Sequence, residues 1–271
     1  MVVQHNMSAM NANRQLGVTT GTLSKSTEKL SSGYRINRAA DDAAGLSISE
    51  KMRSQIRGLN KASSNAQDGI SAIQTAEGAL NEAHSILQRM NELATQAAND
   101  TNTSADRTAV QSEVNALTKE LDRIASTTQF NTKNLLDGTF SGKNLQVGAL
   151  ANQSISISIG TMNATALSVN ALCVSTFTKA GSAMTAVQKA ISKVSTQRSN
   201  LGALQNRLEH TVNNLDNVSE NTQTAESRIR DTDMASEMVQ YSATSIIQQA
   251  GQSMLCLLYT SPSPRDGLLS R

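Results

Sequence analysis

The strongest constraint in this chain is an apolar residue that recurs at every seventh position in two separate stretches. The repeating residues are Met52, Leu59, Ala66, Ile73, Leu80 and Leu87 in the first half, and Val187, Val194, Leu201, Leu208 and Leu215 near the end. A repeat of seven keeps one stripe of a helix against a partner helix. The pattern therefore predicts two long helices packed side by side along this seam, with the intervening chain as a crossover.

Few side chains are available to fill a thick globular core, because the 271 residues include three Phe, three Tyr and no Trp. The only prolines are Pro262 and Pro264, so no proline interrupts a helix in the preceding 261 residues. We therefore predict a mainly α fold, a long antiparallel helical bundle or coiled coil formed by both ends of the chain, with a small β-hairpin region in the middle.

The amino-terminal stretch carries a weaker seven-residue repeat through Val2, Ala9, Leu16, Leu23 and Leu30. Such a thin apolar stripe makes a marginal helix until a partner covers it. Gly33 is typical of a helix stop, and Asp41 and Asp42 are typical of the start of the next helix. The pattern predicts a helix over 1–32 and a hinge over 33–43.

The periodicity predicts the remaining elements in turn. Alternating apolar residues around Leu145–Ala149 and Ile155–Ile159 indicate one hairpin that turns near 151–152. The other expected elements are helices at about 42–99, 104–127, 182–225 and 234–254, with a break over 228–233.

Several classes of function are disfavoured by the sequence. A net charge of +2 lacks the strongly basic character of a nucleic-acid binder. No window has the roughly 18 to 20 consecutive apolar residues of a membrane span, and the amino terminus does not look like a signal peptide. Cys173 and Cys256 have no ligand partners at zinc-site spacing, and His5, His84 and His210 are isolated. We expect no catalytic residues, metal or cofactor.

Several segments, in order along both ends of the chain, resemble bacterial flagellin, the subunit of the flagellar filament. They are LSSGYRINRAADDAAGLSIS at 30–49, QDGISAIQTAEGALNEAHSILQRMNELATQAAN at 67–99, QFNTKNLLDG at 129–138, GALQNRLEHTVNNL at 202–215, AESRIRDTDMASEM at 225–238 and IIQQAGQSML at 246–255. The short middle indicates a short form with a minimal variable region.

The resemblance implies an organisation into two domains. Residues 1–43 with 226–271 would form the terminal-helix domain that lines the inner tube of the filament. Residues 44–225 would form a helical spoke domain with a small β region at about 140–160. The resemblance further implies a secreted, extracellular, helical homopolymer, exported unfolded through the flagellar channel. Its implied partners are the export chaperone, the filament cap and the hook junction proteins, with no membrane or nucleic-acid partner.

The resemblance also implies a receptor surface on the first long helix and its neighbour. Gln88, Arg89, Met90 and Leu93, with Glu113, match the family surface recognised by the flagellin-sensing Toll-like receptor of vertebrates. The structural interpretation is an exposed helix face that contacts the next subunit, and the two roles are compatible. Arg89 is the sharpest candidate, because an exposed arginine flanked by apolar residues is typical of an interface anchor.

The end of the chain departs from the family pattern. Residues 255–271 contain both prolines and Cys256, where flagellins continue with an Ala/Gln/Asn-rich helix and a run of leucines. We interpret these residues as non-native sequence and expect the last helix to stop by about Tyr259, since Pro262 and Pro264 disfavour helix before them. Such a tail would affect closure of the inner tube and binding of the export chaperone.

A helical signalling bundle of the chemotaxis-receptor type is the alternative, because it also has long heptads rich in Ala, Ser, Gln and Thr. Its repeat would run unbroken around a single hairpin tip. The break at 33–43 and the strand-forming middle disfavour it.

Overall fold

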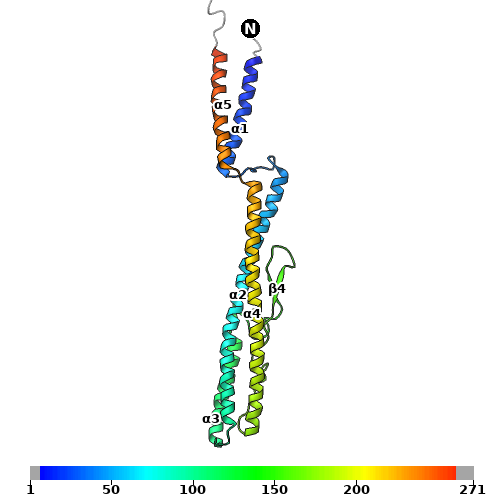
Figure 1. Cartoon of the computed structure of the whole chain (residues 1–271), viewed down its shortest axis with the longest axis vertical. Helices are drawn as coiled ribbons and strands as arrows, with labels where there is room; N and C mark the ends of the chain where they lie inside the picture. The colour runs from blue at the N-terminus through cyan, green and yellow to red at the C-terminus, as the bar shows by residue number, and fades with distance from the viewer. Residues whose placement is uncertain (1–6, 261–271) are drawn as a thin grey trace, which may run out of the picture. The chain divides into compact units, whose positions relative to one another are not determined.

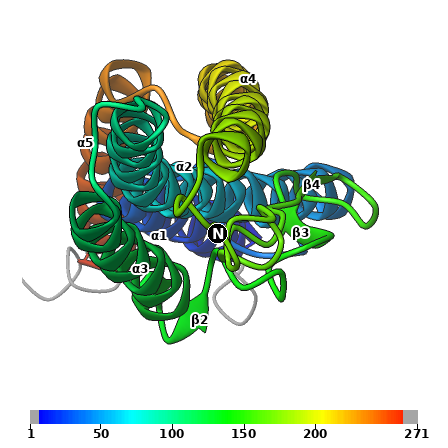
Figure 2. The same cartoon turned by 90° about the horizontal axis from the view of Figure 1, so that it is seen from below.

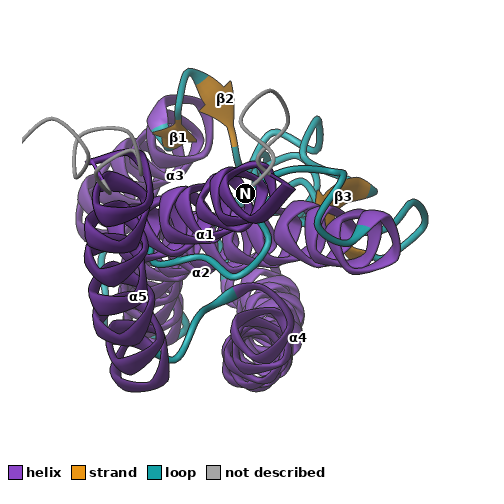
Figure 3. Cartoon of the chain, turned by 90° about the horizontal axis from the view of Figure 1, so that it is seen from above, coloured by secondary structure: helices purple, strands orange, loops and turns teal. Residues whose placement is uncertain are grey.

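The computed structural model describes residues 7–260, and this part of the chain is mostly helical with two small two-stranded sheets (Figure 3). The chain divides into two compact units. Unit 1 comprises residues 1–54 and 221–271, and unit 2 comprises residues 55–220. The mainly α fold built from long helices of both chain ends is confirmed. The boundaries between the two compact units lie at 54/55 and 220/221, inside long helices. The domain boundaries expected from the resemblance lie at 43/44 and 225/226.

Unit 1 contains α1 (Met7–Ser32) and α5 (Met234–Thr260), which pack against each other (Figure 1). The expected helix stop is present, because Gly33 has a φ of 75° and its N–H donates to the Lys29 carbonyl at 2.8 Å. Positive φ is a conformation that glycine adopts without steric cost. A non-helical linker therefore separates α1 from the next helix, at the position where a hinge was expected.

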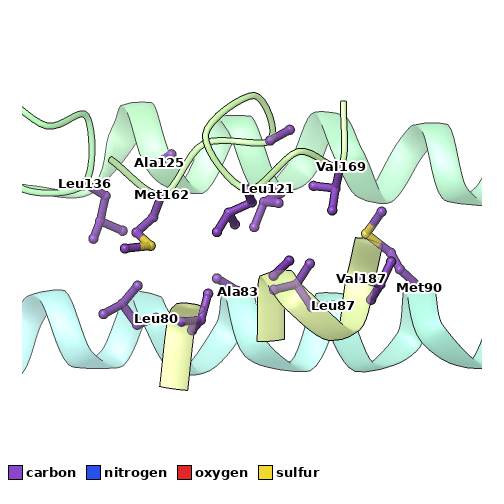
Figure 4. Packing of buried hydrophobic residues seen from close by; sticks show 14 of the residues in the cluster. Leu80, Ala83, Leu87, Met90, Leu121, Ala125, Leu136, Met162, Val169 and Val187 are labelled. Atoms are coloured by element: carbon purple, nitrogen blue, oxygen red, sulfur yellow. The ribbon is translucent and has the colours of Figure 1, made fainter. Parts of the chain in front are cut away.

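Three helices frame unit 2: parts of α2 (Ala43–Ala97) and α4 (Phe177–Arg230), and all of α3 (Ser104–Thr127) (Figure 2). At 55 residues, α2 is about 82 Å long. A capping box starts α3, in which the Thr103 hydroxyl accepts from the Asp106 N–H and the Asp106 carboxylate accepts from the Thr103 N–H. The core of unit 2 is a continuous cluster of aliphatic side chains from α2, α3, α4 and the segment between α3 and α4 (Figure 4).

The middle segment forms two antiparallel pairs of strands. The predicted hairpin is present as β3 (Lys143–Gln146) and β4 (Ser154–Ile157), with Leu145 opposite Ile155. Ile155 and Ile157 are buried, as their alternation with serine requires.

A second, shorter hairpin of β1 (Gln129–Phe130) and β2 (Lys133–Asn134) was not predicted. Its two-residue turn, Asn131 and Thr132, has φ angles of 47° and 62°. The missing signal is a glycine, which usually occupies such turns.

The hairpin of β3 and β4 packs on α2 at two glycines. A methyl group added at Gly58 would lie 2.9 Å from the Ala149 Cβ, and one added at Gly69 would overlap the end of the Leu145 side chain. Ala149 also packs against Leu59 and Leu215. The connection between the two strands is therefore held on the helical core of unit 2.

Three helix ends differ from the periodicity-based prediction. Helix α4 begins at Phe177 instead of 182, because the Thr176 carbonyl and hydroxyl accept from the first-turn N–H groups of Ala180 and Lys179, and Ala180 is fully buried. It also continues to Arg230, so the break shortens to 231–233. Helix α5 extends to Thr260, past the 254 expected from periodicity and within one residue of the stop expected by about Tyr259. Pro262 and Pro264 lie outside the described residues.

Candidate subunit interfaces

The seven-residue seam of α2 and α4 lies in the interior of the protein. Met52 is half-buried, and the other predicted seam residues are at most 7 % exposed: Leu59, Ala66, Ile73, Leu80 and Leu87 on α2, and Val187, Val194, Leu201, Leu208 and Leu215 on α4. Because these side chains cover one another inside unit 2, they leave little apolar surface for another molecule.

The apolar surface of unit 1 is distributed differently. Within the described parts of α1 and α5, the buried residues are Ser26 and Thr244, both small and polar. Large apolar side chains that are 54 to 71 % exposed cover the outside of the same two helices: Met7, Met10, Val18, Met238, Val239, Ile246, Ile247, Met254 and Leu257. An apolar surface of this extent is typical of an interaction site.

The contact between α1 and α5 runs along both helices and is made mostly by half-buried side chains. Leu16 lies over Gly251, Gln248 donates to the Thr20 hydroxyl at 3.3 Å, and Lys29 pairs with Glu237 at 3.5 Å. The other repeat residues of α1, namely Ala9, Leu23 and Leu30, are half-buried, and Val2 lies outside the described residues. The weak stripe therefore buries part of its surface within the chain and leaves the rest available.

A charged cluster on the surface of unit 2 joins α2 to α3. The Arg89 guanidinium donates to the Glu113 carboxylate from Nε at 3.0 Å and from Nη2 at 2.9 Å, and Nη1 donates to Glu92 at 3.2 Å. These carboxylates, Glu113 first, raise the pKa of Arg89 above its ordinary value. Gln88 is exposed beside them and hydrogen-bonds His84 at 3.0 Å. The cluster presents three paired charges to solvent.

Met90 and Leu93 correct the expectation of one continuous exposed patch, because each is only 1 % exposed. Met90 belongs to a companion repeat of buried residues that recurs every seven positions: Ala76, Ala83 and Met90, each three positions after a seam residue, and then Ala97. Alternating steps of three and four are the pattern of a helix with a buried stripe. This signal was present in the sequence, and it separates the buried Met90 from the exposed Arg89.

The described residues contain no cluster of three or more His, Cys, Asp or Glu side chains that could hold a metal ion. Of the three histidines, His84 is half-buried next to Gln88, His210 is exposed, and His5 lies outside the described range. No helix within residues 7–260 is long and apolar enough to span a membrane.

Comparison with known proteins identifies the family of this chain. Residues 3–141 match the bacterial flagellin N-terminal helical region, and residues 184–262 match the C-terminal helical region. The chain is 53 % identical over 264 residues to the flagellin of Halalkalibacterium halodurans, covering 97 % of each protein. This chain belongs to the bacterial flagellin family. The flagellin of Bacillus subtilis is 49 % identical over 297 residues, again covering 97 % of each chain.

Part of the fold agrees with a solved flagellin structure. The crystal structure of Bacillus cereus flagellin superposes with a TM-score of 0.50 at 32 % identity, covering 56 % of this chain and 88 % of that one. Flagellins are a structural protein family, and this chain is a structural subunit of a filament. The unbroken signalling bundle is not favoured by these matches.

Proposed function

We propose that this flagellin polymerises through the exposed apolar surface of α1 and α5, which becomes buried between subunits. The observation that carries the proposal is the contrast between the two units. Unit 2 buries most of its aliphatic residues in its own core, whereas unit 1 leaves residues such as Val239 and Ile246 about 70 % exposed. Burying a side chain of this size contributes about 1.5 to 3 kcal/mol, so a few such contacts are enough to drive association.

The test uses substitutions that act on exposed residues. Val239→Ser and Ile246→Ser should slow polymerisation and raise the concentration at which filaments sediment. Their free energy of unfolding as monomers should change little, because both side chains are already in water. Gln249→Ser, on the exposed polar part of the same helix, is the matched control. Sedimentation equal to the unsubstituted chain for both serine variants would contradict the proposal.

We also propose recognition by the flagellin-sensing Toll-like receptor, through the exposed members of the predicted surface. Gln88, Arg89 and Glu113 reach solvent, and Arg89 pairs with Glu113 across α2 and α3. Met90 and Leu93 would support this surface from below. A receptor reporter assay should show weaker activation by Arg89→Ala than by Lys119→Ala, an exposed charge on α3. Equal activation by the two variants would exclude this surface.

We further propose that the chain is secreted by the flagellar export system and acts outside the cell without catalysis or a cofactor. Its remaining proposed partners are the export chaperone, the filament cap and the hook junction proteins. The family membership and the exposed apolar helices support this, because such helices need protection before assembly. A host strain lacking its own flagellin should release the chain into the medium, and loss of the export apparatus should abolish release.

A further inference from the structure

Unit 2 carries its opposite charges on different stretches of the chain. Residues 62–122, which include the end of α2 and most of α3, have nine Asp or Glu and three Lys or Arg. Residues 138–208, from the hairpin of β3 and β4 through the first part of α4, have six Lys or Arg and no Asp or Glu. Figure 2 shows α3 and α4 on different sides of α2. Unit 2 therefore has an acidic side and a basic side.

Three of the basic residues form a column along α4. Lys179, Lys193 and Arg207 are spaced fourteen residues apart, which is two heptads and about 21 Å of helix. All three residues are exposed. Lys193 donates to the Ala166 carbonyl at 3.1 Å, which places this flank of α4 next to the segment between α3 and α4. We call these three residues the basic column.

Two acidic residues with the same spacing form a column along α2. Asp68 and Glu82 are fourteen residues apart and exposed. Neither takes part in an ion pair within residues 7–260. Arg89 lies seven residues after Glu82 on the same flank and pairs with Glu113 of α3, so this flank is the one next to α3. We call Asp68 and Glu82 the acidic column.

The two columns match in level as well as in spacing. Helices α2 and α4 run antiparallel (Figure 1), and the Glu77 carboxylate lies 3.6 Å from Arg198. Glu82 is five residues further along α2 and Lys193 is five residues earlier along α4, so these two residues lie close to the same level. Because the columns are on different sides of one copy, their charges can meet only between two copies.

Like charges disfavour the intermediate registers between two such copies. Lys61 and Arg89 lie on the flank of the acidic column, half a period beyond its two ends. A shift of half a period from the level register, about 10 Å, would place Lys61 opposite Arg207 and, one period away, Arg89 opposite Lys179. The same shift in the other direction would place Arg89 opposite Lys193. Such repulsion selects against a register, so the charges favour shifts by whole periods.

We propose that the basic column of one copy docks on the acidic column of a second copy, with the two copies shifted by one period of about 21 Å. This register makes two ion pairs: Lys193 with Asp68, and Lys179 with Glu82. Because the two columns are different surfaces, the contact is heterologous and can continue from copy to copy. Level copies would repeat around a closed ring, whereas a shift at each contact produces the open helix that a filament requires.

This contact rests on the polymerisation proposed above and adds a second surface to it. The apolar surface of α1 and α5 supplies association by burial, whereas the columns set the axial shift between neighbours. Complementary charges are suited to that task, because they fix register and partner more than they add affinity.

Charge reversal and compensation test both the contact and its register. Lys193→Glu should raise the concentration at which filaments sediment by about 2- to 10-fold at low salt, because an attraction between exposed charges becomes a repulsion. Adding Asp68→Lys to this variant should restore most of the sedimentation, whereas adding Glu82→Lys should not. The thermal midpoints of the monomers should stay nearly unchanged, since all three residues are exposed.

A matched control and a salt series complete the test. Lys133→Glu, at an exposed residue of β2 outside both columns, makes the same change of net charge and should sediment like the unsubstituted chain. The defect of Lys193→Glu should shrink in 1 M salt, where charges interact over only about 3 Å.

Three results would overturn the proposal. The first is equal sedimentation of Lys193→Glu and Lys133→Glu, and if only Lys193→Glu then lost retention on heparin, the basic column would belong to an anionic polymer instead. The second is a defect that Asp68→Lys does not rescue. The third is rescue by Glu82→Lys, which would indicate level copies. Val239→Ser leaves both columns intact, so the proposed apolar surface is judged separately.

Discussion

Two glycines of α2 should respond in opposite ways to the same added methyl group. Gly78 is exposed, and a Cβ built there meets no atom within 4 Å. Gly58 faces the connection between β3 and β4, where a Cβ would lie 2.9 Å from the Ala149 Cβ and 3.3 Å from its Cα. Ordinary carbon contacts are about 3.5 to 4.0 Å long, so only the second site is overfilled.

The expected magnitudes follow from these distances. Alanine is favoured over glycine inside a helix by about 1 kcal/mol, so Gly78→Ala should raise the free energy of unfolding by about that amount. Gly58→Ala has the same gain, but overpacking costs about 1 to 3 kcal/mol. Its net effect should range from neutral to a loss of about 2 kcal/mol, and the two variants should differ by about 1 to 3 kcal/mol.

The overpacking cost is expected to persist because the loop at Ala149 has little freedom to move away. The Val147 N–H donates to the Gln153 carbonyl at 2.9 Å, and the Gln146 amide donates to the Gly148 carbonyl at 2.8 Å. Asn65 of α2 donates to the Gln146 carbonyl at 3.2 Å. The methyl group at Gly58 would therefore press on a loop that is bonded both internally and to the helix.

Urea unfolding followed by circular dichroism measures both variants, and an unchanged urea dependence identifies a true change of stability. The double variant Gly58→Ala with Ala149→Gly should recover most of the loss, because it removes the other methyl group of the clash. A stabilisation by Gly58→Ala as large as that by Gly78→Ala would refute the packing of this loop on α2.

Three further predictions concern other parts of unit 2. Leu80→Ala should lower the free energy of unfolding by about 2 to 5 kcal/mol, since Leu80 is fully buried. Arg89→Ala should leave the thermal midpoint nearly unchanged, and equal losses of stability in the two variants would contradict their assignment to core and surface. Thr132→Asn should stabilise the protein by about 1 kcal/mol, because asparagine tolerates the positive φ better than threonine, and a lower urea midpoint would argue against that turn. Hydrogen bonds from the Thr103 hydroxyl and N–H lower the pKa of Asp106 below its usual 3.8, so the ionised carboxylate stabilises the fold above that pH and this stabilisation is lost as the pH falls through and below it. Thr103→Ala should therefore lower the free energy of unfolding more at pH 7 than at pH 3. An equal effect at both pH values would disprove the coupling.

The long helices could be predicted because their signals are redundant along the chain. Leu80 repeats the information given by Ile73 and Leu87, so one atypical residue does not change the prediction. The ends of helices depend on single local contacts instead. The start of α4 is set by the backbone and hydroxyl of Thr176, and nothing in its periodicity marks that position.

The candidate surfaces were less predictable because position along a helix does not by itself give exposure. Met90 and Arg89 are adjacent in sequence but belong to opposite environments, and only the companion repeat through Ala83 and Ala97 distinguishes them. The isolated backbone bridge between Tyr34 and Asp231 gives no sequence signal at all, since it is a single pairing between residues far apart in the chain.

The distribution of apolar side chains connects the fold to assembly. If α1 and α5 buried their large apolar residues against each other, the chain would be a stable monomer with little reason to polymerise. Their contact instead encloses Ser26 and Thr244, and leaves Val239 and Ile246 in water. The stability that this pair lacks in the isolated chain is the free energy that subunit contacts can supply.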